Sequence, residues 1–232
     1  MIRFRDRNLR GRSHTGWLDS RHSFSFADYS DPQNMGLGNL RVINDDTVAP
    51  GAGFPTHAHA NMDILTWVIR GGLEHKDSTG AGGVIGPGDL QRMSAGPGVR
   101  HSEFNASASE PVRFLQIWLI PDQAIAAPIY QQVSFDPADL RDQLKLVAAR
   151  GDAPVGLESG SRLYIGRLGE GVEVSHPLEA GRAAWVQVAT GIVKLQGGEL
   201  REGDGAALTE EAEVRLTAET DSTIHFFRCS GT

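Results

Sequence analysis

The sequence predicts an all-β protein made of many short strands, and three observations support this fold class. Glycine is abundant, at 28 of 232 residues. Much of it separates short segments in which apolar and polar residues alternate; a period of two is typical of strands, and glycine-rich segments between them are typical of tight turns. A weak internal sequence repeat further indicates that one β-unit is present in two copies.

The first half of the chain contains the clearest strands. The basic stretch from Arg3 to Arg12 is interpreted as a solvated edge strand. The segment at 112–120 is the most hydrophobic, and we expect it in the middle of its sheet. The turn at 86–89 reverses the chain. Strands are predicted at residues 40–44, 62–70, 73–78, 90–94, 99–104 and 112–120.

The second half begins after a linker. Residues 121–128 are rich in alanine and bounded by prolines, and we predict an N-terminal domain over 1–125 and a C-terminal domain over 126–232. Asp136 and Pro137 predict a short helix over 137–144, with the aspartate as cap and the proline at the first helical position. Later strands are predicted at 184–195 and 213–228.

The internal repeat relates the two halves. The run beginning at Trp67 is answered by the run beginning at Val186, and Pro87-Gly-Asp is answered by Glu202-Gly-Asp, at offsets of 119 and 115 residues. Two copies of a β-sandwich or barrel unit explain this spacing. The offset aligns His57 with His176, which we interpret as a loop histidine. We therefore expect no metal in the C-terminal half.

Composition narrows the function classes. The net charge of −7 argues against general nucleic-acid binding through phosphate neutralisation. The single cysteine, Cys229, excludes an internal disulfide and thiolate zinc modules. No apolar run approaches the ~18 residues of a membrane span, and no signal peptide is visible. We expect no membrane association and a cytoplasmic location.

Two short motifs each contain two potential metal ligands separated by one residue: His57-Ala-His59 and His101-Ser-Glu103. We call these motifs the two doublets. Side chains at i and i+2 of a strand share a face, so adjacent strands would bring three imidazoles and one carboxylate together. This set suits one divalent transition metal ion. Iron is expected first, with nickel, manganese, cobalt, copper and zinc left open. Four protein ligands leave two octahedral positions for an oxidant or a chelating substrate.

Other polar residues are candidates for supporting roles. Asp63 is expected to orient an imidazole or to replace Glu103 as a ligand. His75 lines the cavity or faces solvent, and Asn105 and Gln116 are candidate wall residues. Several large apolar residues are assigned to the core: Trp67, Met93, Phe104, Phe114 and Trp118.

The same residues resemble the two cupin motifs. Gly51, five further residues and His57-x-His59 fit the first motif, with Asp63 where glutamate is usual. The end of the second motif is matched by Gly98-x-x-His101-x-x-x-Asn105. Aspartate is one methylene group shorter than glutamate. The expected set of metal ligands is unaffected, but the side chains that orient those ligands could be arranged differently.

Longer runs resemble the pirin family, most closely the bacterial pirin-like proteins described as quercetin 2,3-dioxygenases. The resemblance covers essentially the whole chain. The runs that carry it are Gly16–Phe26, His75–Ser78 and Pro87–Glu103.

The resemblance implies a bicupin, with two β-barrels and metal only in the N-terminal one. It implies that His57, His59, His101 and Glu103 are the ligands. It also implies a dioxygenase that opens flavonols such as quercetin with release of carbon monoxide, its substrates being an aromatic chelator and dioxygen. Glu103 would then accept the proton of the flavonol 3-hydroxyl group. The alternative is a non-enzymatic, redox-sensing regulator that uses the same ligands and binds a protein partner.

Overall fold

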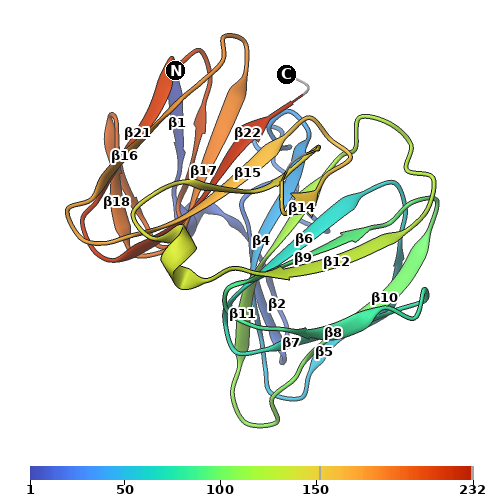
Figure 1. The fold of residues 1–232 in the computed structure, drawn as a ribbon. Helices are drawn as coiled ribbons and strands as arrows, with labels where there is room; N and C mark the ends of the chain where they lie inside the picture. Colours follow the sequence, from blue (N-terminus) through green and yellow to red (C-terminus); the bar gives the residue numbers. More distant parts are fainter. Residues whose placement is uncertain (152, 231–232) are drawn as a thin grey trace. The chain divides into compact units, whose positions relative to one another are not determined.

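The computed structural model describes residues 1–151 and 153–230, and nearly all of its regular structure is β-strand (Figure 1). The chain divides into two compact units. The N-terminal unit comprises residues 11–35 and 40–135, and the C-terminal unit comprises residues 1–10, 36–39 and 136–232. Each unit contains one seven-stranded and one four-stranded sheet, which confirms the predicted all-β class. None of the helices in the described residues is long and apolar enough to cross a membrane.

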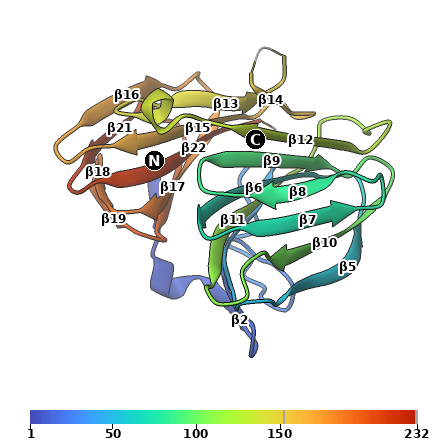
Figure 2. The same cartoon turned by 60° about the horizontal axis from the view of Figure 1, so that its bottom comes forward.

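The N-terminal unit contains every strand predicted between residues 40 and 120. Its most hydrophobic strand, β11, is central in the larger sheet, as expected. The order in that sheet is β12 (Ile129–Ser134), β9 (Asp89–Ser94), β6 (Asp63–Arg70), β11 (Val112–Leu119), β4 (Leu40–Val48), β3 (Leu18–His22) and β2 (Gly11–His14). The order in the smaller sheet is β5 (Gly53–His59), β10 (Val99–Asn105), β7 (Leu73–Asp77) and β8 (Gly82–Ile85), seen side by side in Figure 2.

The C-terminal unit repeats this arrangement. Its larger sheet has the order β1 (Ile2–Arg5), β20 (Gly205–Leu208), β17 (Ala183–Thr190), β22 (Ser222–Cys229), β15 (Arg162–Leu168), β13 (Lys145–Ala149) and β14 (Val155–Gly156). Its smaller sheet has the order β16 (Glu173–Pro177), β21 (Glu213–Ala218), β18 (Ile192–Leu195) and β19 (Gly198–Arg201). The two orders correspond strand for strand, so that β6 matches β17, β11 matches β22 and β5 matches β16. The duplication indicated by the internal repeat is therefore present in the topology.

One of the two edge strands of each large sheet comes from the other half of the sequence. Strand β1 pairs with β20, and β12 pairs with β9. The N-terminal basic stretch accordingly provides an edge strand, β1, before a 3-10 turn, η1 (Arg7–Leu9). Because β1 lies within residues 1–10, the C-terminal unit is discontinuous in sequence. The domain boundary between residues 125 and 126 stays a prediction.

Four features of the second half differ from the prediction. The helix expected over 137–144 is one 3-10 turn, η2 (Pro137–Leu140). Asp136 caps it, accepting a hydrogen bond from the Ala138 amide. The chain is already extended at Arg141, and Asp142 has a φ of 55°, so the helix cannot continue. The two long strands are each divided, at Gly191 and at residues 219–221, and His176 lies in strand β16 rather than in a loop.

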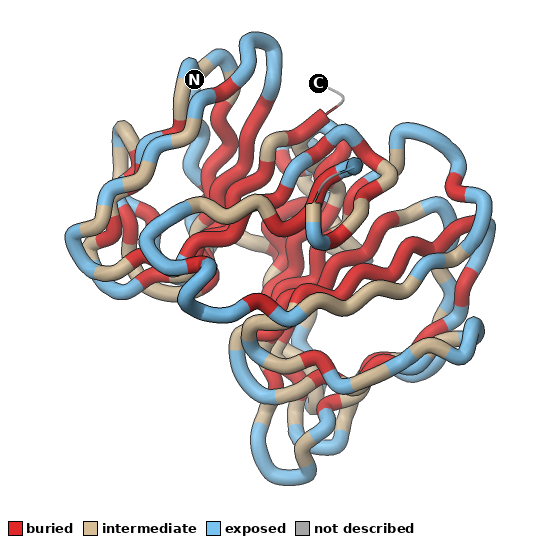
Figure 3. Tube along the Cα trace, in the orientation of Figure 1, coloured by how far each residue is buried: buried red, intermediate tan, exposed pale blue. Residues whose placement is uncertain are grey.

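Buried residues line the strands of both units (Figure 3). The two cores differ in one respect that positions the site. In the C-terminal unit one continuous apolar cluster fills the interior. In the N-terminal unit the apolar residues form separate clusters, with Val68 and Phe114 in one and Ile64 in another. Thr66 and Gln116 are buried at intervening inward positions of β6 and β11 and lie opposite each other. Polar residues therefore occupy the middle of this barrel.

Candidate metal centre

Strands β5 and β10 bring the two predicted doublets together. The strands are antiparallel neighbours, with His101 directly opposite His57 and Val99 opposite His59. The ligating atoms of His57, His59 and His101 all lie within 4.8 Å of one another. His101 is buried, whereas the other two imidazoles are half-buried. The i, i+2 spacing thus places three imidazoles on one face, as the sequence analysis predicted.

Hydrogen bonds indicate which nitrogen carries the proton in His57 and in His101. His57 Nδ1 donates to the Pro55 carbonyl oxygen at 2.8 Å, because a carbonyl can only accept. His75 Nε2 donates to the Asp77 carboxylate at 3.3 Å, which leaves His75 Nδ1 as an acceptor for His101 Nδ1 at 3.4 Å. Each partner therefore turns the Nε2 lone pair of its histidine toward the cluster.

The resulting arrangement fits a metal cation. His57 Nε2 and His101 Nε2 lie 2.9 Å apart, and with these tautomers both present lone pairs with no proton between them. Two imidazole nitrogens bound at right angles to one ion, each at about 2.1 Å, would lie about 3.0 Å apart. Burial first, and then the charges of His57 and His59, lowers the pKa of His101 to about 2. Burial, and then His57, lowers the pKa of His59 to about 4. These imidazoles are therefore neutral at pH 7, the form that binds metals.

Glu103 lies beside the histidines but in a second group. A Glu103 carboxylate oxygen and one ring nitrogen each of His75 and His101 lie within 4.8 Å of one another. The β5 histidines are not part of this second group. Gln116 Nε2 donates to both carboxylate oxygens, at 3.2 and 3.1 Å. Gln116 is in turn held by Thr66, whose hydroxyl donates to its Oε1 at 2.7 Å. Burial raises the pKa of Glu103 to about 7. The wall residue Gln116 is thus the side chain that orients the acid.

An open surface cavity borders one histidine of the cluster. It has a volume of about 500 Å³, and His59 is on its wall, together with residues of the turn before β10. The edge of Trp118 packs against His59, with ring centroids 4.9 Å apart and an interplanar angle of 85°. The Trp118 indole nitrogen is buried without a hydrogen-bond partner among the described residues. Trp118 was predicted to lie in the core, and its ring contact with His59 places it beside the candidate metal centre as well.

Two other candidates have different partners. Asp63 is fully buried and accepts two hydrogen bonds from Arg92, at 3.1 and 2.9 Å. Its ion pair with Arg92 is on the larger sheet, and Asp63 belongs to neither ligand group. Asn105 donates to the carbonyl oxygens of Val48, Ala49 and Glu110, so its amide holds the loop after β10.

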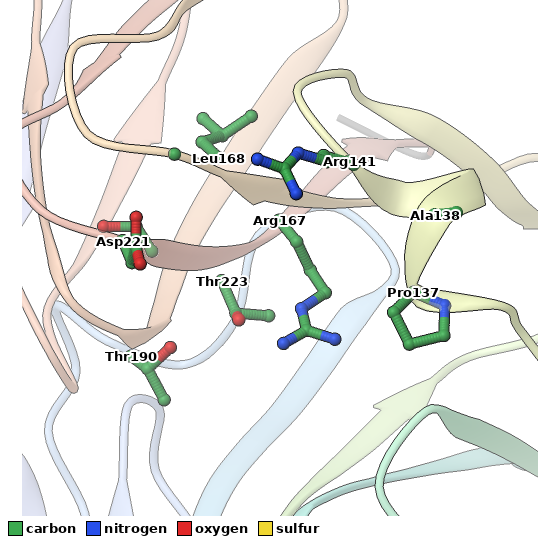
Figure 4. A pocket seen from close by; sticks show the side chains of 10 residues that line it. Pro137, Ala138, Arg141, Arg167, Leu168, Thr190, Asp221 and Thr223 are labelled. Atoms are coloured by element: carbon green, nitrogen blue, oxygen red, sulfur yellow. The ribbon is translucent and has the colours of Figure 1, made fainter.

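The described residues of the C-terminal unit form no comparable cluster. Within residues 1–151 and 153–230, both groups of metal-ligating side chains lie in the N-terminal unit. His176 is on β16, the counterpart of β5, but its cross-strand partner is Val214. A cavity of about 410 Å³ in this unit lies beside η2 and contains Arg141, Arg167 and Asp221 on its wall (Figure 4).

Comparisons with known proteins agree with this geometry. The chain matches the family model described as Pirin over residues 3–119 and the model described as quercetinase C-terminal cupin domain over residues 146–228. The quercetin 2,3-dioxygenase of Escherichia coli (strain K12) is 40% identical over 227 residues, or 98% of each chain. A putative quercetin 2,3-dioxygenase of Mycobacterium tuberculosis (strain ATCC 25618 / H37Rv) is 46% identical over 215 residues, or 90% of this chain and 87% of that one.

Solved structures give the same result. The bacterial pirin YhhW of Escherichia coli in complex with nickel(II) is 38% identical, with a TM-score of 0.93 and all of both chains covered. A quercetin 2,3-dioxygenase of Acinetobacter baumannii, 22% identical with a TM-score of 0.74 over 96% of this chain and 85% of that one, shares the fold. The bicupin architecture is confirmed, as is a cofactor of the divalent transition metal class. Iron as the particular metal stays a prediction.

Proposed function

The chain belongs to the pirin family, and from this premise we propose that it is a metal-dependent dioxygenase that cleaves flavonols such as quercetin with release of carbon monoxide. The observation that carries the proposal is the pair of imidazole Nε2 atoms 2.9 Å apart, next to a cavity of about 500 Å³. Binding pockets for small molecules and cofactors have volumes of roughly 300–1,000 Å³. The names of the curated relatives supply the substrate class.

We propose that His57, His59, His101 and Glu103 hold the metal ion. The ion, when bound, supplies coordination positions for a chelating substrate and lowers the pKa of its hydroxyl group. His57 and His101 contribute because their Nδ1 protons are held by Pro55 and His75, which keeps each Nε2 free. His75 is therefore a positioning residue, and Asp77 fixes its tautomer in turn.

We propose that Glu103 accepts the proton of the flavonol 3-hydroxyl group. A carboxylate that ligates through one oxygen keeps a second oxygen for a proton. Gln116 holds the carboxylate in place by donating to both oxygens. In this scheme the Trp118 ring forms an aromatic wall beside His59, and its indole N–H donates to an oxygen of the bound flavonol.

The test is carbon monoxide release from quercetin in air by protein loaded separately with Fe, Ni, Mn, Co or Cu. Release in proportion to quercetin consumed, abolished by a chelator, would support the proposal. Free metal ions at the same concentration, without protein, are the control. No release with any of these metals would contradict the flavonol activity.

The proposed setting of the reaction follows from composition. We propose a cytoplasmic location, supported by the single cysteine, which cannot form an internal disulfide. The net charge of −7 supports a small-molecule substrate over a nucleic acid.

A further inference from the structure

A small pocket in the C-terminal unit is surrounded by arginines. Arg162, Arg182 and Arg228 line it with Glu179, and its volume is about 130 Å³. We call it the arginine pocket. It holds three positive charges against one negative charge, in a chain whose net charge is −7. Such a local excess of cations in an acidic protein requires an explanation of its own.

The fold places these arginines at one end of the barrel, where Arg162 and Arg182 are exposed and Arg228 is largely buried. Arg162 on β15 lies directly opposite Arg228 on β22, so the two side chains share a face of the sheet. Tyr164 and Phe226, two residues further along each strand, are on that same face and belong to the apolar core. Arg182 immediately precedes β17, the next strand in the sheet (Figure 1).

Protein partners neutralise only part of this charge. Glu179 accepts a hydrogen bond from Arg228 Nη2 and lies 3.8 Å from Arg182 Nε. Its pKa is lowered, first by the hydrogen bond from Arg228 and also by the charges of Arg182 and Arg162. Arg162 forms no ion pair among the described residues.

Buried nitrogen atoms at this end of the barrel are also unsatisfied. Arg228 Nε and His176 Nε2 are buried without a hydrogen-bond partner among the described residues. A buried N–H group without a partner is costly, and such groups in native proteins commonly mark a bound ion or water. His176 is on the strand that corresponds to β5, with its ring packed on Tyr164 at a centroid distance of 4.5 Å. This end of the C-terminal barrel therefore contains buried polar groups, although it lacks the metal-ligating cluster found at β5 in the N-terminal barrel.

Size and charge define the ligand class. A volume of about 130 Å³ corresponds to about four water molecules at roughly 30 Å³ each. This accommodates a phosphate ion or one carboxylate group, and excludes a flavonol. Guanidinium groups match the paired oxygens of both anions.

We propose that the arginine pocket is a binding site for a small oxyanion, either free phosphate or the carboxylate of a small acid. The site binds through Arg162, Arg182 and the inward-facing Arg228. The other cavity of this unit, beside η2, serves as a comparison because its charges are balanced. Arg141 there pairs with Asp142, and Asp221 lies on the same wall as Arg167.

The experiment is calorimetric titration of the metal-loaded full chain with inorganic phosphate and, separately, with succinate, at constant ionic strength. We expect one site per chain. The double substitution Arg162→Gln and Arg182→Gln should weaken binding at least about tenfold, because two charge-assisted hydrogen bonds are lost. Glu179→Gln should tighten binding, since it removes the carboxylate that competes for Arg228. Tighter binding of phosphate or of succinate will identify which source of the oxyanion the pocket prefers.

The matched control is the double substitution Arg141→Gln and Arg167→Gln, which changes the net charge equally within the same unit. It should retain the affinity within about twofold, as expected for long-range charge effects that salt screens. Thermal unfolding of each variant checks that it is folded. Binding that survives the Arg162 and Arg182 substitutions would place the anion elsewhere, the metal centre included, and would overturn the proposal. Absence of binding by both anions would overturn it as well.

Discussion

At the scale of single residues, His101 is the side chain on which the metal centre depends most. It belongs to both ligand groups, lies 2.9 Å from His57 Nε2 and is oriented by His75. We expect His101→Ala to lose most of the bound metal and any oxygenase activity. Metal analysis after desalting measures the effect. His14→Ala, an exposed histidine of the same unit, is the control and should retain its metal. Equal metal content in the two variants would contradict the ligand assignment.

A substitution at Glu103 can distinguish metal binding from catalytic turnover of quercetin. Glu103→Gln keeps the shape of the side chain and its place beside Gln116, but it loses the negative charge and the proton acceptor. We expect a part of the metal to remain and kcat for quercetin to fall by about 10²-fold or more, as for loss of a general base. Steady-state kinetics at measured metal occupancy gives the answer. Full activity per bound metal would exclude Glu103 as the base.

His75 acts through another residue, so its substitution should change affinity. Removing the acceptor for His101 Nδ1 in His75→Phe should raise the metal dissociation constant by about 10–100-fold, the usual effect of losing a histidine's orienting partner. Competition with a chelator measures this constant. His75→Gln, which can still accept from His101, should restore part of the affinity. An unchanged constant in His75→Phe would limit His75 to a packing role.

The sequence predicted the histidines of the centre because their spacing is local. Two residues apart on one strand, His57 and His59 share a face whatever the partner strand is. Gln116 and Trp118 could not be assigned in this way. Their roles depend on the pairing of β11 with β6 and on the contact with His59, which join residues far apart in sequence.

At the scale of elements, glycines and turn residues set the ends of the strands. The alternation that predicted one strand over 184–195 continues through Gly191, but the chain turns there. Gly191 has a φ of 86° and approaches Ser222 so closely that a Cβ atom would overlap its hydroxyl. Periodicity alone does not contain this information, because the obstructing residue comes from β22. A similar nonlocal cause, the pairing of Arg141 with Arg167, accompanies the early end of η2.

The Gly191 turn yields a stability prediction. Gly191→Ala should lower the free energy of unfolding by about 2–4 kcal/mol, since it combines a left-handed backbone with overlap against Ser222. Gly171→Ala has a similar φ of 80° but open space around the new methyl group. It should cost only about 1–2 kcal/mol. Denaturant unfolding of both variants compares the two costs. Equal losses would show that steric overlap at Gly191 is relieved by a small shift.

At the scale of the whole molecule, one topology is used twice with different interiors. The internal repeat predicted the duplication, and the exchange of β1 and β12 was not predictable because strand pairing across the chain leaves no local pattern. The N-terminal barrel interrupts its apolar core with Thr66 and Gln116 to hold Glu103. The C-terminal barrel keeps a continuous apolar core, with a histidine, His225, buried in its sheet.

This buried histidine makes the stability of the protein depend on pH. Desolvation lowers the pKa of His225 from 6.5 to about 3, and its cross-strand partners, Ile165 and Gln187, carry no charge. Between these values the unfolded chain binds a proton that the folded chain does not. Stability therefore falls as the pH decreases below 6.5, by up to about 1.4 kcal/mol per pH unit for this one group.

The variant His225→Gln isolates this contribution. It cannot bind the proton, so its unfolding free energy should fall less steeply between pH 6.5 and pH 5 than that of the natural sequence, whatever its stability at pH 8. The difference in slope between the two proteins is the quantity to measure, by denaturant titration at several pH values, because all other titrating groups are common to both. Parallel slopes would mean that His225 is protonated in the folded state as readily as in the unfolded chain.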